Sequence, residues 1–149
     1  MSLKARLGDD MKQALRAGDK HRLSTLRMTL AAIQQREVDE RIELDDPQVL
    51  SVIEKMIKQR RESAVQYRAG DREELAQREE AEIGFLDDYL PEPMSEADLD
   101  ALIAQVVADT GAGSMRDMGK VMNQIKQLAE GRADMAAVSA KVKARLSAG

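Results

Sequence analysis

Few side chains of this 149-residue chain could act directly in catalysis. The chain contains one histidine, His21, and no cysteine. Histidine-based triads, multi-histidine metal sites, thiolate chemistry and cysteine zinc sites are therefore all excluded. We interpret His21 as a surface residue in the first turn of a helix. Neither a G-x-x-x-x-G-K-[ST] loop nor a strand-linked G-x-G-x-x-G segment is present, so nothing indicates nucleotide binding by these two routes.

Carboxylates gather in one segment, "REEAEIGFLDDY", and could in principle bind metal. Its acidic residues are Glu79, Glu80, Glu82, Asp87 and Asp88. A di-iron helical bundle would need Glu-x-x-His pairs on facing helices, and the single histidine does not allow them. We therefore interpret the run as a solvated helix face. The chain alone is not predicted to be an enzyme, and no cofactor or metal is predicted for it.

Basic side chains cluster in "EKMIKQRRES", which is Glu54–Ser63. They are Lys55, Lys58, Arg60 and Arg61. Like charges stacked on one side of an isolated helix destabilise it by about 0.2–0.5 kcal/mol per pair, so the cluster requires an explanation. We favour salt bridges to acidic residues on the same and neighbouring helices. The alternative is a basic patch that binds a negatively charged partner.

The stretch "SMRDMGKVMNQIK" places a glycine within a helical apolar stripe. Ser114 is expected to cap the helix, and Met115, Met118, Met122 and Ile125 follow at helical spacing. Gly119 costs the helix about 0.5–1 kcal/mol relative to alanine. A bare backbone there would allow the close approach of a neighbouring helix or of a phosphate backbone, and Lys120 beside it favours the second partner.

The charge of the chain is unevenly distributed. The net charge is −4, and residues 91–110 contain five acids and no base. Residues 111–149, in contrast, contain seven bases and three acids. The candidate nucleic-acid-binding residues in this basic tail are Arg116, Gly119, Lys120, Lys126, Gly131, Arg132 and Lys141. The aromatic residues all lie outside the tail, which disfavours base stacking and favours recognition of folded RNA by its shape.

The elements that would position these residues are all predicted to be helices. Apolar residues recur with a 3.6-residue period almost throughout, and no segment alternates as a strand would. Asp46-Pro47 and Asp71 with Glu74 are expected helix starts, and "LPEPMS" is the expected boundary. The prediction is an all-α chain with a four-helix N-terminal part, residues 1–92, followed by a small three-helix C-terminal domain, residues 93–149.

The chain shows no sequence signal for a membrane. No apolar run approaches the 18 residues of a spanning helix, and the start "MSLKARLGDD" is charged and amphipathic. We expect a cytoplasmic protein without a membrane partner.

Four blocks of the sequence resemble the GatB/YqeY family, in particular its short stand-alone YqeY-like members. The blocks are "LRMTLAAIQQREVD", "IEKMIKQRRESAVQY", "EIGFLDDYLPEPMSEADL" and "DMGKVMNQIKQLAEGRAD". Together they span nearly the whole chain. The resemblance implies an all-helical fold whose C-terminal part is similar to the tail of the GatB subunit of the aminoacyl-tRNA amidotransferase. That tail is associated with binding to the elbow side of tRNA.

The match to the GatB tail has two departures. Gly119, Val121 and Met122 match the Gly-x-Val-Met half of the tail's signature, and Gly131, Arg132 and Ala133 match its second half. About one extra helical turn separates the two halves here. The catalytic part of GatB is missing altogether.

The resemblance therefore implies a non-catalytic tRNA-binding accessory protein, with an amidotransferase or an aminoacyl-tRNA synthetase as candidate protein partner. A carbon–nitrogen ligase role with glutamine as amido-N-donor would come through association with other subunits. The first alternative is a helical protein-interaction module that binds no RNA, because a methionine-rich tail can present an adaptable apolar groove. Glutamine-dependent amidotransferase activity of the chain itself ranks last.

Overall fold

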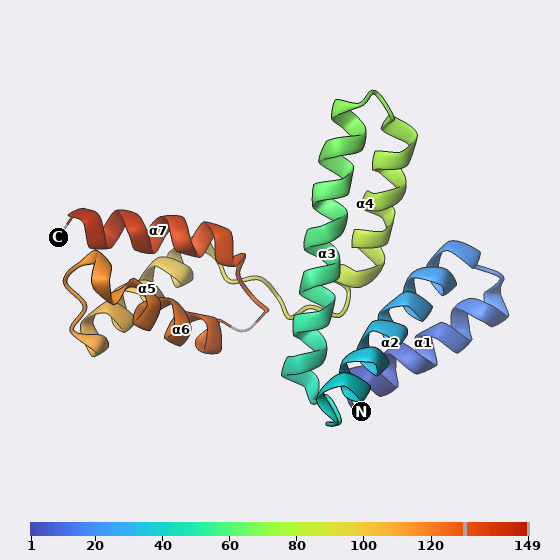
Figure 1. The fold of residues 1–149 in the computed structure, drawn as a ribbon, viewed down its shortest axis with the longest axis horizontal. Helices are drawn as coiled ribbons and strands as arrows, with labels where there is room; N and C mark the ends of the chain where they lie inside the picture. The colour runs from blue at the N-terminus through green and yellow to red at the C-terminus, as the bar shows by residue number, and fades with distance from the viewer. Residues whose placement is uncertain (130, 149) are drawn as a thin grey trace. The chain divides into compact units, whose positions relative to one another are not determined.

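The computed structural model describes residues 1–129 and 131–148, and within them every regular element is helical (Figure 1). Seven α-helices and one short 3₁₀ helix are found there, without a strand. The all-α prediction is thus confirmed. The chain divides into two compact units, Met1–Leu90 and Pro91–Gly149, which are described one at a time.

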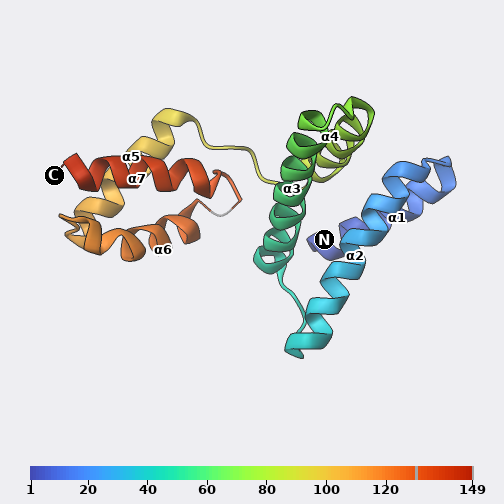
Figure 2. The ribbon, with the colours of Figure 1, turned by 45° about the horizontal axis from the view of Figure 1, so that its top comes forward.

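The N-terminal unit consists of two antiparallel helix pairs. Its helices are α1 (Leu3–Ala17), α2 (Lys20–Glu40), α3 (Asp46–Ala69) and α4 (Glu73–Asp87). α1 lies beside α2 and α3 lies beside α4 in both views (Figures 1 and 2). One apolar core joins the two pairs, with Leu7, Leu26, Ile53 and Leu86 fully buried in it. The buried residues recur at helical spacing, as the apolar periodicity predicted, but Leu15 of α1 and Val38 of α2, which fall on the predicted stripes, are 57% and 66% exposed.

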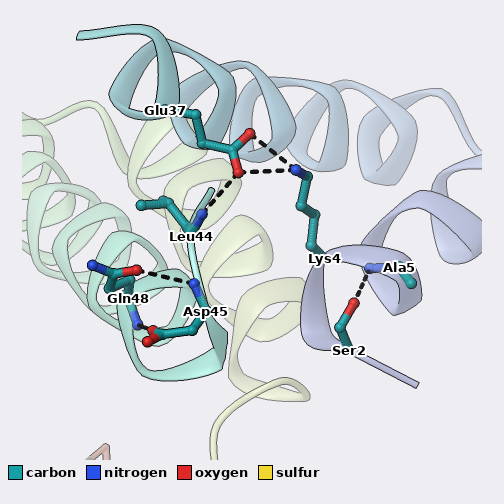
Figure 3. A network of polar contacts seen from close by, with 7 residues as sticks. All are labelled: Ser2, Lys4, Ala5, Glu37, Leu44, Asp45 and Gln48. Carbon is teal, nitrogen blue, oxygen red and sulfur yellow. Dashed lines mark hydrogen bonds and ion pairs between the residues drawn. The ribbon is translucent and has the colours of Figure 1, made fainter. Parts of the chain in front are cut away.

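Polar side chains fix the start of α3 and its junction with α1 and α2. Asp45 and Gln48 form a capping box, in which each side chain accepts the other residue's backbone N–H at 3.0 Å. Glu37 of α2 accepts the Leu44 N–H and the Lys4 ammonium, both at 2.9 Å (Figure 3). The backbone hydrogen bond, followed by the Lys4 contact, lowers the pKa of Glu37 below its ordinary value.

Two of the expected helix starts are corrected by the structure. The cap of α3 is Asp45 and not Asp46, which is already the first helical residue. The predicted cap at Asp71 is wrong. Asp71 has a φ of 60°, a left-handed turn conformation, and α4 begins two residues later without a side-chain cap. The turn between α3 and α4 uses Asp71 because aspartate tolerates this conformation better than most residues do.

The C-terminal unit contains three α-helices and the 3₁₀ turn. They are α5 (Glu96–Thr110), η1 (Met115–Asp117), α6 (Met118–Leu128) and α7 (Met135–Ala148). Ile103, Val121, Ile125 and Val142 lie in its core, and Met118 and Met122 pack against that core. Ser114 precedes η1 without a capping hydrogen bond from its side chain. The predicted helix start at Ser114 is therefore a 3₁₀ turn that leads into α6.

Candidate nucleic-acid interface

Gly119 is an exposed residue in the first turn of α6, with open space around it. A Cβ atom added there would meet no heavy atom within 4 Å, and its φ is not in the left-handed region. The expectation that Gly119 admits a closely packed neighbouring helix is therefore wrong. Neither the backbone conformation nor the internal packing of the described residues requires a glycine at this position. Its backbone is instead accessible from solvent.

One solvent-facing side of α6 combines this bare backbone with positive charge. Gly119, Asn123 and Lys126 are spaced four and three residues apart, so they share one side of the helix, and all are exposed. Lys120 lies next to Gly119, and its ammonium donates to the Thr110 carbonyl at the end of α5 at 3.3 Å. Arg116, in η1, is exposed one turn before Gly119. We call Arg116, Gly119, Lys120, Asn123 and Lys126 the α6 face.

Gly131 and Arg132 belong to the turn before α7 and hold the fold of that turn. Gly131 has a φ of 71°, which explains its glycine without any ligand. The Arg132 Nε donates to the Glu92 carbonyl at 3.0 Å, and its own carbonyl accepts the Met94 N–H at 2.8 Å. Arg132 thus fastens the segment before α5 to this turn.

Lys141 joins α7 to α5. Its ammonium lies 2.8 Å from the Asp100 carboxylate and 3.1 Å from that of Glu96. These two contacts, the first with Asp100, raise the pKa of Lys141 above its ordinary value. Of the predicted cations, Lys141 and Arg132 therefore make contacts within the unit, whereas Arg116 and Lys126 form no ion pair with another described residue.

The second predicted basic patch is divided in the same way. Lys55, Lys58 and Arg61 are exposed on α3. Arg60, in contrast, is 7% exposed, and its guanidinium donates to Glu82 of α4 and to the Met56 carbonyl. The Arg60 side chain accordingly does not contribute to a surface patch, and the salt bridge between α3 and α4 is of the kind that we favoured for this cluster.

Sequence reasoning missed a polar cluster where α2 meets α3 and α4. Glu82 is not on a solvated face, because its side chain is only 13% exposed and pairs with Arg60. His21 is in the first turn of α2 as expected, but its ring packs edge-on against Phe85, and its Nε2 lies 3.3 Å from Glu82. His21, Arg60 and Glu82 are far apart in the sequence, and no local sequence pattern connects them.

The described part of the chain contains neither a metal-binding cluster nor a membrane-spanning helix. No group of three or more histidine, cysteine, aspartate or glutamate side chains there could hold a metal ion. None of the helices described is both long and apolar enough to cross a bilayer.

Comparison with known proteins identifies the family. The profile of the family described as "Yqey-like protein" matches residues 4–146. The chain belongs to the YqeY-like family. Two relatives carry the name "Altered inheritance of mitochondria protein 41, mitochondrial". The one from Kluyveromyces lactis is 34% identical over 109 residues, which are 70% of this chain and 58% of the relative. The one from Pyrenophora tritici-repentis is 31% identical over 140 residues, or 92% and 77%.

A third relative of the same name, from Lachancea thermotolerans, is 33% identical over 108 residues. The aligned part is 70% of this chain and 58% of that relative. The chain thus spans less than two thirds of the length of two of these three YqeY-like relatives. The sequence-based recognition of the family is confirmed.

Proposed function

We propose that this YqeY-like protein is a non-catalytic accessory protein that binds tRNA. We further propose that the α6 face contacts the RNA backbone. The observation that carries the proposal is Gly119, a helical glycine that neither packing nor conformation explains, with cations around it. A phosphate backbone can approach bare helix closely, and neighbouring Lys and Arg side chains neutralise its charge.

The composition of the C-terminal unit supports a backbone reader over a base reader. The three aromatic residues of the chain, Tyr67, Phe85 and Tyr89, all lie in the N-terminal unit. Stacking on unpaired bases is a main source of affinity for single strands, and the α6 face offers no ring for it. Folded RNA, recognised through phosphates and shape, is the substrate class that remains. The resemblance to the tRNA-binding tail of GatB points the same way.

The RNA-binding role does not depend on one compartment. The sequence favours the cytoplasm, whereas the relatives are named as mitochondrial proteins. tRNA serves translation in both, and we propose that the protein acts in the compartment in which its tRNA is used. An amidotransferase or an aminoacyl-tRNA synthetase would be a fitting protein partner. Ligase activity would then belong to that partner.

The proposal is tested by measuring the affinity of the full chain for unmodified tRNA at several salt concentrations. Three to five phosphate contacts predict a slope of log affinity against log salt of roughly −3 to −4. Lys120→Ala and Lys126→Ala should each make the slope shallower by about one. Lys12→Ala, an exposed lysine on α1, serves as the control and should leave the slope unchanged.

A pair of glycine variants tests the close approach itself. Gly119→Gln and Gly84→Gln both replace an exposed helical glycine that has open space around it. Both should stabilise their helices by about 0.5–1 kcal/mol, since glutamine forms helix better than glycine. Only Gly119→Gln should weaken tRNA binding, by about tenfold, a loss of about 1.4 kcal/mol. Equal binding by both variants, or a flat salt response, would remove the case for this face.

A protein-interaction module without RNA binding is the second candidate, and Met115 and Leu128 favour it. Both are apolar residues at the two ends of the segment that carries the α6 face, and they are 40% and 61% exposed. If this candidate is right, the chain binds no tRNA at low salt and instead captures a protein after nuclease treatment. Transamidation by the purified chain with ATP, glutamine and misacylated tRNA would favour the amidotransferase alternative.

A further inference from the structure

The exposed side of α6 carries side-chain amides and no carboxylate. The helix reads MGKVMNQIKQL, with neither aspartate nor glutamate. Asn123, Gln124 and Gln127 are all exposed, and none of them forms a hydrogen bond with another residue that the structure describes. Each amide therefore keeps its two N–H donors and its carbonyl acceptor for a partner. This side of α6 thus offers neutral hydrogen-bonding groups as well as cations.

Asn123 and Gln127 lie in one row with Gly119. The three residues are spaced four apart, so each lies about one turn beyond the one before it. A side chain on an α-helix leans towards the helix N-terminus, over the turn before its own Cα. The Asn123 amide is accordingly directed towards the turn that contains Gly119. A strand that approaches the bare backbone closely therefore meets this amide.

The first two residues of the row are poor helix formers in the interior of a helix. Asn123 is the only asparagine of the chain, and asparagine and glycine both rank well below alanine, glutamine and lysine in helix propensity. Both Asn123 and Gly119 are exposed, so the core of the unit requires neither of them. Two weak helix formers one turn apart, on one side of α6, indicate a requirement other than helix stability.

The chemistry of the row is complementary to the ribose of RNA. An A-form helix presents a wide, shallow minor groove with 2′-hydroxyl groups, which both donate and accept hydrogen bonds. An amide can answer both roles, because its N–H donates and its carbonyl accepts. Lys120 and Lys126 lie three residues before and after Asn123 and flank it on opposite sides. They would therefore lie near the phosphates at the edges of the groove.

We propose that Asn123, supported by Gln127, contacts 2′-hydroxyl groups in the minor groove of a helical arm of tRNA and so makes the α6 face selective for RNA. This inference rests on the proposed function. Phosphate contacts alone carry no such selectivity, because every nucleic acid presents the same charged groups. Asn123 is thus the specificity-determining residue of the face, and the cations supply most of the affinity.

Asn123→Ala and Gln124→Ala form a matched pair. Both remove an exposed amide from α6, but Gln124 lies about 100° further around the helix than Asn123. Alanine forms helix better than either residue, so both variants should fold, as circular dichroism can verify. Asn123→Ala should weaken tRNA binding about tenfold and leave its salt slope unchanged, because a neutral group releases no counterion. Gln124→Ala should bind as the native chain does, and equal effects of the two variants would overturn the assignment.

RNA hairpins with altered sugars test the 2′-hydroxyl contact itself. Hairpins that match the helical arms of tRNA are compared with the same sequences carrying 2′-fluoro groups, which keep the A-form but cannot donate a hydrogen bond. The native chain should bind its preferred arm about tenfold more tightly in the 2′-hydroxyl form, and Asn123→Ala should lose most of this preference.

The outcomes separate this inference from the proposed function. If the native chain binds tRNA but binds both hairpin forms equally, or binds no hairpin, the 2′-hydroxyl contact is wrong and the phosphate contacts of the α6 face are unaffected. A preference that Asn123→Ala retains in full would overturn the role of Asn123. A chain that binds no tRNA at low salt would overturn both proposals.

Discussion

Positive side chains of the C-terminal unit act in two different ways. Lys141 and Arg132 are engaged with α5 and with the segment before it, whereas Arg116 and Lys126 extend into solvent beside Gly119. The sequence gives all four the same charge. Only their partners separate a cation that stabilises the fold from a cation that is available to a phosphate. The α6 face is therefore smaller than the set of bases in the tail.

The Glu37 carboxylate predicts acid sensitivity at the junction of α1, α2 and α3. Its pKa is lowered by the Leu44 N–H and by Lys4. A lowered folded-state pKa contributes stability above the unfolded-state value of about 4.3, and that stability is lost as the pH falls through the folded-state value. Glu37→Gln should thus unfold at lower urea concentration than the native chain at pH 7. The difference should shrink steadily below about pH 4.

Urea unfolding followed at pH 7 and at pH 3 measures this effect. Glu43→Gln is the control, since Glu43 is an exposed neighbour that makes no hydrogen bond or ion pair with another described residue. It should unfold like the native chain at both pH values. If Glu37→Gln lowers the urea midpoint by the same amount at pH 3 as at pH 7, the ionisation of Glu37 does not contribute to stability.

At the scale of helices, the sequence predicted what periodicity and end signals encode. The apolar periods gave the helices, and the proline pair at Pro91 and Pro93 marked the connection before α5. Helix starts were predicted less well. Asp45, Asp46 and Asp71 have the same side chain and could each cap a helix, so only the observed backbone shows that Asp45 does and the other two do not. The open surroundings of Gly119 could not be predicted either, since they depend on which neighbouring helices lie nearby.

Contacts between helices were the least predictable level. The Arg60–Glu82 pair and the nearby His21 come from three different helices. Their sequence signal was only a cluster of bases on one helix and a run of acids on another, which does not show which residues pair. Among adjacent basic residues of one helix, burial decides which is structural and which faces solvent, and it depends on how the helix is rotated against its neighbours.

The buried arginine makes a prediction at this scale. Arg60→Ala should destabilise the N-terminal unit by about 3 kcal/mol, because it leaves Glu82 partly buried without its counter-charge. Arg61→Ala, at the exposed neighbouring position, should change the free energy of unfolding by less than about 0.5 kcal/mol. Chemical denaturation of the two variants gives the comparison. Similar losses for both would mean that the Arg60–Glu82 pair does not stabilise the packing of α3 against α4.

For the whole molecule, the proposed RNA contact falls on one of the two units. The α6 face belongs to residues 91–149. Each unit has a core of its own, with Leu26 and Ile53 in one and Val121 and Ile125 in the other. The α6 face is therefore held by the core that contains Val121 and Ile125.

This division predicts that RNA binding can be assigned to one unit by physical separation. Residues 1–90 and residues 91–149, produced as separate fragments, should each be helical and unfold cooperatively, because each unit is compact and has a core of its own. Fragment 1–90 should bind no tRNA. Fragment 91–149 should keep the tRNA affinity of the full chain and its salt dependence, because it carries the whole α6 face. Titration of tRNA with each fragment at several salt concentrations measures this. If tRNA binding follows residues 1–90, or needs both fragments together, the assignment of RNA contact to the α6 face is wrong.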